Sequence, residues 1–376
     1  MKKKLLVFHS TIAPYRVDLF NDLSHAFDAT ICFSTKFKVF KDTSKIDKLL
    51  EYSPVYLVHK KKNIYQAESS EYVRMLKETN PDVVLTAEMG VNTIITLLYR
   101  WIHRKHYKVV SMCDDSYDMI ANNNDHSLRH RIVRRVVTPY LDNLILVEPK
   151  VVDWYQNHYH KGVWFPIIRD EDKARKNYER LIPESQELVN KYRLAGKHVF
   201  LYVGRLVALK NVKTIIQAFK ELNDNNSVLV IIGSGEEEGN LHKEAEAANN
   251  IIFTGRLEDD NLYKWYNVAT AFILASYQES FGAVTNEALL AGCWAIVSRR
   301  AGSQCLVMPG VNGDVFSPTD TDELCQKMKE ICKLLPALPD YLSLKPNAMI
   351  YGYRELLGNL VETLMLSENS LSDKCT

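Results

Sequence analysis

The chain has 376 residues, of which 46% are hydrophobic and 25% charged, and its 47 Lys and Arg against 46 Asp and Glu leave a net charge of +1. This composition is that of a globular protein and excludes a disordered tail, while 15 Gly, 12 Pro and 7 Cys exclude a collagen-like chain or a disulfide scaffold. A net charge of +1 argues against a dedicated nucleic-acid binder, so we expect no nucleic-acid partner. At about 150 residues per domain, the length predicts two or three domains.

The first apolar run, Leu5–Phe8, follows three lysines and could be mistaken for a signal peptide. It ends at His9 and no small-residue cleavage site follows, so we interpret it as a buried strand. No run approaches the roughly 18 apolar residues of a membrane-spanning helix. The cysteines form no C-x-x-C pair and no zinc spacing, which is typical of reduced thiols. We therefore expect a cytoplasmic protein with no metal site.

Short apolar runs alternate along the chain with longer amphipathic segments. They predict strands at 5–8, 29–33, 83–86, 109–112, 144–147, 199–203, 228–232, 251–253, 271–274 and 295–298. Apolar spacing at i, i+3 and i+4 predicts helices over 16–27, 211–222 and 281–291. Apolar runs separated by helices indicate parallel strands buried on both faces. The expected fold is α/β, with two doubly wound domains and ligands at the carboxyl ends of the strands, in a cleft between the domains.

The net charge is the sum of two unlike halves. Residues 1–168 carry 24 Lys and Arg against 18 Asp and Glu, a net +6, whereas residues 169–376 carry 23 against 28, a net −5. We therefore predict an N-terminal Rossmann-like domain over 1–168 and a second one over 169–345. Residues 346–376 are predicted to form a helix, over 348–366, that packs back on the first domain, and a loose tail.

The first candidate for chemistry is a pair of cations that follows a predicted strand. Gly204 permits a tight turn, Arg205 offers a planar fork for phosphate oxygens, and Lys210 adds a point charge just before a predicted helix. Backbone N–H groups and the helix dipole would add to an anion site there. The alternative is two surface cations without a ligand.

The second candidate is the Gly233-Ser234-Gly235 turn, which also follows a predicted strand. Such a turn can bring backbone N–H groups against a phosphate. Glu238 stands where a dinucleotide-binding fingerprint has its third glycine, so a Rossmann dehydrogenase is disfavoured. A plain strand-to-helix turn explains these residues equally well.

The third candidate is a pair of carboxylates eight positions apart, Glu279 and Glu287. A helix that begins near Phe281 would hold Glu287 inside it and leave Glu279 on the loop above its N-terminus. A favourable helix cap is the simpler interpretation of Glu279. Glu287 lies in an apolar segment, however, where a carboxylate needs hydrogen-bond partners that ligand hydroxyls would supply.

Taken together, these residues resemble glycosyltransferase family 4, whose members are retaining enzymes of the GT-B fold. The resemblance covers about residues 199–320 in the family's order and spacing. It is carried by 204–205, 210–211, 233–235, 253–255, the E-x7-E pair Glu279 and Glu287, Gly292, 302–303 and 312–313. The first half matches loosely, through His9, 13–16 and 81–84.

The resemblance implies a nucleotide-sugar donor and no separate cofactor. It implies that Arg205 and Lys210 hold the donor diphosphate, that Glu279 faces the transferred sugar, and that Glu287 accepts hydrogen bonds from the ribose hydroxyls. The other donor-side residues that it implies are Gly204, Gly233, Gly235, Leu257 near the nucleobase, and the backbone amides of Phe281, Gly282 and Ala283. No metal is required once fixed cations and amides stabilise the departing diphosphate.

The N-terminal half departs from the family at two positions. Family members often carry a Gly-Gly turn after the first strand, where this chain has residues 10–16 without glycine. Many members also carry a His after the fourth or fifth strand, near the sugar, where this chain has 112–115. Asp114 or Asp115 is a candidate replacement, and the alternative for Asp114 is a solvated or capping carboxylate. Arg16 is a second acceptor-side candidate, which would reach a phosphate or close the cleft.

The basic residues of the first half suggest the acceptor. Cations interleave with aromatic residues at Lys36, Lys38, Lys41, Lys45 and Lys48, and at 60–62, 101–108 and 126–135. Such a patch could hold the protein at an anionic membrane that carries a lipid-diphosphate acceptor, although solvated faces explain each run equally well.

We expect a glycosyltransferase that acts on a glycan or lipid-linked acceptor. The alternatives are a GT-B nucleotide-sugar epimerase or hydrolase and a non-catalytic binding module.

Overall fold

A computed structural model describes residues 1–34, 44–57, 64–121, 128–246 and 248–366. The chain divides into two compact units. The first comprises residues 1–115, 123–167 and 354–376, and the second comprises 116–122 and 168–353. This division falls one residue before the predicted boundary, and it groups 346–353 with the second unit rather than with the C-terminal segment. The loose tail predicted after residue 366 lies outside the described residues.

The described residues of the first unit form a seven-stranded sheet in the order β3-β2-β1-β4-β5-β6-β7, and the strand pairs are parallel. Its strands are β1 (Lys4–His9), β2 (Asp28–Phe33), β3 (Val55–Tyr56), β4 (Val83–Ala87), β5 (Lys108–Cys113), β6 (Asn143–Leu146) and β7 (Val163–Trp164). Its helices are α1 (Val17–Ala26), α2 (Ser44–Asp47), α3 (Ile64–Thr79), α4 (Val91–Ile102), α6 (Leu128–Val137) and α7 (Pro149–Tyr159), with short 3-10 turns η1 (Pro14–Arg16) and η2 (Thr138–Tyr140).

The second unit has a six-stranded sheet in the order β10-β9-β8-β11-β12-β13, again with parallel pairs. Its strands are β8 (His198–Val203), β9 (Ser227–Ile232), β10 (Ile251–Gly255), β11 (Ala271–Leu274), β12 (Trp294–Ser298) and β13 (Gly313–Phe316). Its helices are α5 (Tyr117–Ala121), α8 (Glu171–Arg180), α9 (Ile182–Tyr192), α10 (Val212–Leu222), α11 (Glu238–Ala245), α12 (Asp259–Val268), α13 (Val284–Leu290) and α14 (Thr321–Leu334), with 3-10 turns η3 (Ala208–Lys210) and η4 (Gly302–Leu306).

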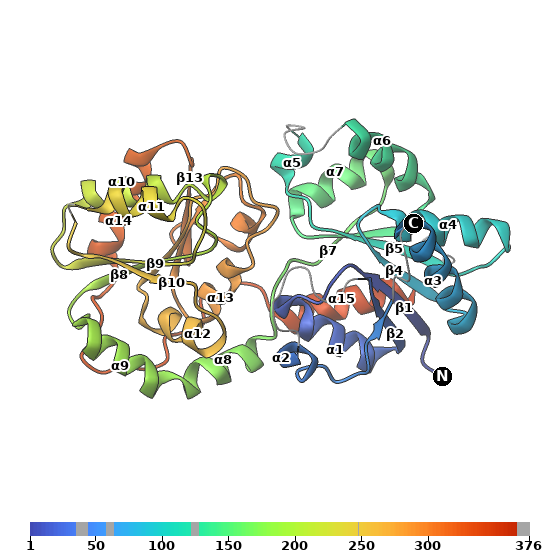
Figure 1. Ribbon diagram of the computed structural model, residues 1–376, viewed down its shortest axis with the longest axis horizontal. Coiled ribbons are helices and arrows are strands. Elements are labelled where there is room, and N and C mark those ends of the chain that lie inside the picture. The colour runs from blue at the N-terminus through green and yellow to red at the C-terminus, as the bar shows by residue number, and fades with distance from the viewer. Residues whose placement is uncertain (35–43, 58–63, 122–127, 247, 367–376) are drawn as a thin grey trace, which may run out of the picture. The chain divides into compact units, whose positions relative to one another are not determined.

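Burial explains why the central strands form. Every residue of β8 and β9 is buried, because helices cover both faces of the sheet (Figure 1). Ile215 of α10, Leu241 of α11 and Leu324 of α14 share one apolar cluster with the strand residues Phe200 and Ile231. The expected α/β fold is confirmed in both units, and no described helix has the length and apolar character to cross a bilayer.

The C-terminal helix α15 (Tyr353–Met365) returns to the first unit (Figure 1). Leu360 and Leu364 are fully buried along its apolar face. Arg354 lies 3.4 Å from the Asp22 carboxylate of α1, and Lys3 donates a hydrogen bond to the Met365 carbonyl. The segment is therefore an integral part of the first unit.

Both sheets place their first strand beside the fourth, so the order in which successive strands are added to the sheet reverses there while all strands stay parallel. In the first sheet the reversal lies between β1 and β4, and in the second between β8 and β11. In doubly wound sheets ligands bind beyond the carboxyl ends of the strands at such a reversal. The residues after these four strands are therefore the first place to look for a site.

Candidate functional site

The segment after β8 holds its cations through a buried asparagine. Asn211 has a left-handed backbone (φ 54°), and its side chain donates hydrogen bonds to the carbonyls of Ala275 (3.1 Å) and Pro318 (2.7 Å). Thr214 in turn donates to the Asn211 side-chain oxygen at 2.8 Å. This network fixes the end of η3, and hence Lys210, against the loop that follows β11.

Lys210 and Glu279 form an ion pair across the reversal of the second sheet. Lys210 comes from the segment after β8 and Glu279 from the loop after β11, and the side chains are only 14% and 17% exposed. Ser276 donates a weaker hydrogen bond to the same carboxylate oxygen at 3.4 Å. The ammonium group has three donors, so it can hold Glu279 and still reach an anion. Arg205, in contrast, is exposed to solvent.

The loop between Glu279 and α13 offers backbone donors to a ligand. Within the described chain, the N–H groups of Phe281, Gly282 and Ala283 make no hydrogen bond, whereas the carbonyl of each accepts at least one. Gly282 has φ 94°, and a Cβ there would lie 2.6 Å from Leu274 Cδ2. Only glycine therefore fits this turn without strain. Phe281 is 1% exposed, whereas Gly282 and Ala283 are partly exposed, so the amides of these two residues can reach an anionic oxygen.

The glycines of the 233–235 turn serve loop packing. A Cβ on Gly233 would lie 1.8 Å from the Gly204 carbonyl oxygen, and one on Gly235 would lie 2.3 Å from the Leu206 carbonyl oxygen. The Gly233 N–H donates to the Gly255 carbonyl at 2.9 Å, so it is not available to a phosphate. These contacts favour the plain-turn interpretation of Gly233. They also show that the backbone of the 233–235 turn packs directly against the backbone at Gly204 and Leu206, which leaves no room for a side chain on Gly233 or Gly235.

Glu287 lies in the first turn of α13, which begins at Val284 rather than near Phe281 as predicted. Tyr266 donates a hydrogen bond to its carboxylate at 3.0 Å. Desolvation raises the pKa of Glu287, and the charge of Arg169 and the bond from Tyr266 offset this only in part. The carboxylate is partly buried and retains acceptor capacity for a ligand hydroxyl.

Sequence reasoning missed the residues that surround Glu287. The Arg169 guanidinium donates to the Tyr263 hydroxyl at 3.0 Å and lies 5.7 Å from the centre of that ring. Its backbone N–H donates to Asn286 in α13 at 3.0 Å. Arg169 is distant in sequence from Glu287 and belongs to no local pattern, so only the fold could reveal it. Leu257, the residue expected near the nucleobase, is partly exposed on the loop after β10.

In the first unit, the two acceptor-side candidates contact each other. Arg16, 2% exposed, donates to the Asp114 carboxylate at 2.6 Å. Asp114 follows β5, and its side chain remains 32% exposed. The structure thus brings together the two residues that the sequence proposed separately, and Arg16 is held by Asp114 rather than projecting alone toward a phosphate.

Glu88 is a further carboxylate beside this pair that the sequence analysis missed. It follows β4 with φ 57°, and its carboxylate accepts a hydrogen bond from the Asp114 N–H at 3.3 Å. Desolvation and the nearby charges of Asp115 and Asp114 raise the pKa of Glu88, although the residue reaches solvent. The local feature that distinguishes Glu88 is its left-handed backbone, which cannot be recognised from the sequence.

His9 and Asp115 complete the polar group at the carboxyl ends of the first sheet. His9 is the last residue of β1. Burial, together with the Arg16 charge, lowers the pKa of His9 to about 4, so the imidazole is neutral at pH 7. Asp115 accepts from Arg134 at 2.9 Å. Neutral imidazole and carboxylates at one sheet edge are suited to hydrogen bonding with sugar hydroxyls.

These features can be compared with known proteins. Residues 184–344 match the family model described as glycosyl transferases group 1. This segment contains Arg205, Lys210, Glu279 and Glu287, with the ion pair and the open amides described above. The match concerns this segment, which is less than half of the chain. The family named from the sequence resemblance is therefore confirmed for this part of the chain.

Curated relatives match part of the chain. An uncharacterized glycosyltransferase of Methanocaldococcus jannaschii is 30% identical over 169 residues, which cover 41% of this chain and 43% of the relative. The lipopolysaccharide 1,2-N-acetylglucosaminetransferase of Salmonella typhimurium is 30% identical over 140 residues, or 34% and 37% of the two chains. The chain thus spans about two fifths of the length of these relatives.

Solved structures match nearly the whole chain in fold. The Anabaena protein Alr3699/HepE, solved in complex with UDP and glucose, has a TM-score of 0.74 at 16% identity and covers 96% of this chain and 99% of its own. At this identity the likeness concerns the fold alone. The expected GT-B fold, with two Rossmann-like α/β units, is confirmed.

Proposed function

We propose that this protein is a glycosyltransferase that transfers a sugar from a nucleotide-diphosphate sugar to a glycan or lipid-linked acceptor in cell-surface polysaccharide synthesis. The observation that carries the proposal is the Lys210–Glu279 pair in the loop segment whose amides at 281–283 lack hydrogen bonds within the described chain, inside the segment that matches the glycosyltransferase family model. The names of the Salmonella relative and of the UDP-bound Anabaena structure support the choice of donor and acceptor class.

In the proposed reaction, the bond between the sugar C1 and the diphosphate oxygen breaks while the acceptor oxygen bonds to C1 on the same face. The acceptor proton passes to a departing diphosphate oxygen, so the anomeric configuration is retained and no separate base is needed. Lys210, Arg205 and the amides of 281–283 stabilise the charge that develops on the diphosphate. Because these groups neutralise that charge, we propose that the transfer needs no metal.

Glu279 and Glu287 have different tasks in this proposal. Glu279 holds Lys210 in place and faces the sugar, where an oxocarbenium-like centre develops positive charge. Glu287 accepts hydrogen bonds from the ribose hydroxyls with the lone pairs that Tyr266 leaves free. On the acceptor side, we propose that Asp114, oriented by Arg16, and Glu88 hydrogen-bond to the acceptor or the transferred sugar.

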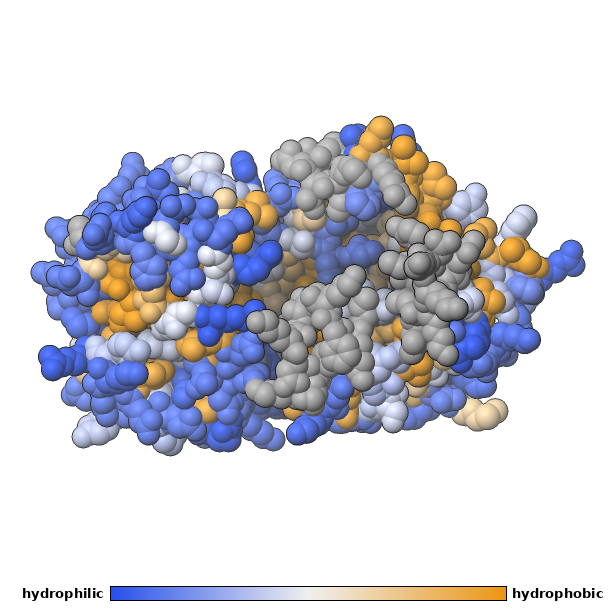
Figure 2. Space-filling view, in the orientation of Figure 1, coloured by the Kyte–Doolittle hydropathy of each residue, from blue (hydrophilic) through white to orange (hydrophobic). Residues whose placement is uncertain are grey.

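A surface of the first unit supports an acceptor in a membrane. It consists of the exposed apolar residues Ile94, Leu98, Trp101 and Ile102 on α4, Leu128, Ile132 and Val136 on α6, and Tyr140 on η2, and we call it the α4–α6 surface. Trp101 is 78% and Ile132 54% exposed. Figure 2 shows hydrophobic side chains gathered over α6. A cavity of about 1160 Å³ is lined by several of these residues together with Arg104 and Lys105.

Apolar side chains flanked by cations are typical of proteins that bind an anionic lipid surface. Arg131 and Arg135 on α6 and Arg104 and Lys105 after α4 are exposed and supply the cations. Lys36, Lys38, Lys41 and 60–62, which the sequence analysis also proposed, lie outside the described residues. We therefore propose a cytoplasmic location at the inner face of a membrane.

The donor assignment is tested by thermal shift with a panel of UDP-, GDP- and ADP-sugars. We expect at least one donor to raise the Tm of the wild type, and Lys210→Ala and Glu279→Gln to weaken that donor at least tenfold. The matched controls are Lys213→Ala and Glu244→Gln, which break an ion pair of 3.7 Å on the surface of the same unit. These controls should bind as the wild type does.

Two outcomes would contradict the donor assignment. If no nucleotide sugar raises the wild-type Tm, the proposed donor site is wrong. If stabilisation survives both substitutions, the roles given to Lys210 and Glu279 are wrong. Turnover of the bound donor without acceptor, to free sugar or to an epimer, would instead support a hydrolase or an epimerase.

A further inference from the structure

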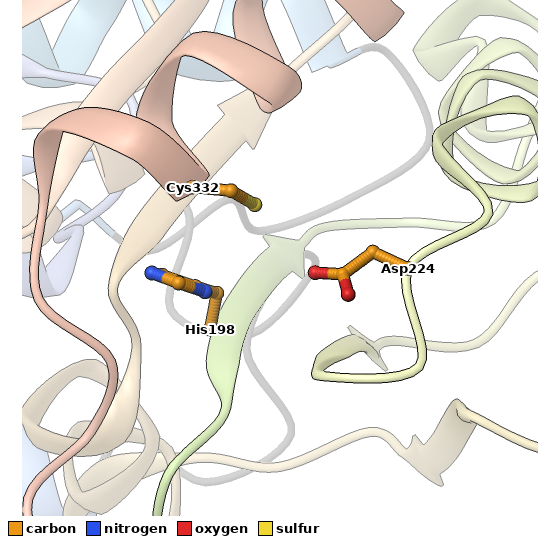
Figure 3. A group of neighbouring side chains, drawn as sticks. All are labelled: His198, Asp224 and Cys332. Carbon is orange, nitrogen blue, oxygen red and sulfur yellow. The ribbon is translucent and has the colours of Figure 1, made fainter.

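A cluster of metal-ligand side chains lies in the second unit at the edge of the sheet opposite the donor residues. His198 is the first residue of β8, Asp224 lies on the loop between α10 and β9, and Cys332 lies in the last turn of α14. One possible ligand atom from each lies within 4.8 Å of the others. Figure 3 shows the three side chains converging from a strand, a loop and a helix.

The hydrogen bonds of His198 leave one ring nitrogen for a ligand. Nε2 lies 3.0 Å from the Leu335 carbonyl oxygen, which can only accept, so Nε2 carries the proton. Nδ1 is buried and has no hydrogen-bond partner in the described chain. The residue is 9% exposed, so water has little access to it. A histidine that ligates a metal characteristically donates its other N–H to a backbone carbonyl, and His198 already does so.

Asp224 is also held in place as a ligand. Its carboxylate accepts from the Asn226 N–H at 3.0 Å and from the Ser227 hydroxyl at 2.7 Å. Burial acts to raise the pKa of Asp224, but these hydrogen bonds outweigh it and the pKa is lowered. The carboxylate is therefore ionised at neutral pH, and each oxygen keeps a lone pair for a cation.

Cys332 supplies a soft ligand at the third corner. Its sulfur lies 3.5 Å from the Ser227 hydroxyl, which orients both Cys332 and Asp224. Burial raises the pKa of the thiol, so a metal must displace its proton on binding. Cys332 and Asp224 are both partly exposed, so an ion can reach the cluster from solvent.

We propose that His198, Asp224 and Cys332 bind a transition-metal ion of the Zn²⁺ class, with water as a fourth ligand. One nitrogen, one oxygen and one sulfur ligand suit Zn²⁺, whereas Mg²⁺ and Ca²⁺ require oxygen ligands. Zn²⁺ ligands in a tetrahedron lie roughly 3.5 Å apart, so a closure of about 1 Å completes the site. The bound ion joins the start of β8 to the α10–β9 loop and to the end of α14. It is a structural site, separate from the proposed transfer.

This site departs from the expectation of no metal site. The three ligands stand 26 and 108 positions apart, so no spacing rule could have revealed them. The fold brings them together because β8, the α10–β9 loop and the end of α14 meet at the amino-terminal edge of the sheet.

The test uses the full chain after treatment with a chelator. We expect Zn²⁺ to raise its Tm and to bind at one ion per chain through these residues, more weakly as the pH falls because the Cys332 thiol then keeps its proton. Co²⁺ in place of Zn²⁺ should give a thiolate-to-metal absorption band. Cys332→Ser and His198→Gln should abolish the band and weaken Zn²⁺ at least tenfold, whereas Cys305→Ser, which removes another cysteine of the same unit, should preserve both.

Two results would overturn the proposal: no effect of Zn²⁺ on the wild-type Tm, or a cobalt–thiolate band that persists in Cys332→Ser. Serine is close to cysteine in size and Cys332 is partly exposed, so this variant should fold, which its metal-free Tm checks. Nucleotide-sugar binding should be unchanged in Cys332→Ser. A failure of the metal site is thereby distinguished from a failure of the donor site.

Discussion

Glu287 illustrates a conflict between stability and binding in a single residue. Desolvation raises the pKa of its carboxyl above the value in the unfolded chain, so the fold disfavours the ionised form. A carboxyl with a raised pKa contributes most to stability when it is protonated, below its unfolded pKa of about 4.3, and this contribution is lost as pH rises through the folded pKa. At neutral pH the charge therefore destabilises the ligand-free protein.

Glu287→Gln tests this account. Glutamine cannot ionise but can still accept from Tyr266, so we expect the ligand-free variant to have a higher Tm than the wild type at pH 7, with a smaller difference at pH 4. Donor binding should weaken by about 10- to 100-fold, because a charge-assisted hydrogen bond to the ribose is lost. Equal Tm differences at both pH values, measured by calorimetry, would refute the role of the charge.

At this scale, the sequence predicts residues in short local patterns and misses those that the fold delivers from afar. Lys210, Glu279 and Gly282 lie on the segments that follow β8 and β11, and the apolar runs and glycines of these segments made them recognisable in the sequence. Arg169 and Glu88 were missed because their partners, Glu287 and Asp114, are far away in the chain. The role of the Gly233 N–H was also hidden, since its acceptor is the carbonyl of Gly255, the last residue of β10.

Among the elements, continuous apolar runs predicted the central strands well. All ten predicted strands are present within a residue or two of their bounds, because a strand buried on both faces must be apolar throughout. The edge strands β3 and β7 have two residues each, and β13 contains Gly313 and Asp314, so none has an apolar run to detect. Helix α13 begins at Val284 because the positive φ of Gly282 interrupts the helix before it.

Helices α4 and α6 are the basis of the prediction that the protein binds anionic membranes. We expect the protein to sediment with vesicles that contain anionic lipid at low salt, and binding to weaken at high salt because the cations are screened. Trp101→Glu and Ile132→Glu should reduce binding at least tenfold, since each places a charge at an apolar contact.

The matched control is Tyr341→Glu, which alters a side chain 85% exposed on the second unit and should bind vesicles as the wild type does. No binding even at low salt would remove the membrane proposal. Equal loss in all three variants would show that added negative charge, rather than the α4–α6 surface, is responsible.

For the whole molecule, the sequence predicted two doubly wound units and the family of the second. The classic strand order follows from alternating strands and helices, since right-handed crossovers leave few other arrangements. The helical pattern of 348–366 predicted α15, but not its start at Tyr353. The charge split of +6 and −5 now has a physical counterpart. Exposed cations of the first half flank the α4–α6 surface, whereas in the second half Arg205 and Lys210 lie at the proposed donor site.

The central claim is that the protein transfers a sugar from a nucleotide-sugar donor at the site formed by Lys210, Glu279 and the amides of 281–283. The most direct test measures release of nucleoside diphosphate on addition of lipid-linked or free glycan acceptors, in EDTA and in the Cys332→Ser background so that loss of a structural metal does not interfere. We predict acceptor-dependent release with retention at the anomeric carbon, and a fall of about 10²- to 10³-fold in Lys210→Ala with Lys213→Ala unchanged. Release that does not depend on acceptor, or that survives Lys210→Ala undiminished, would contradict the account.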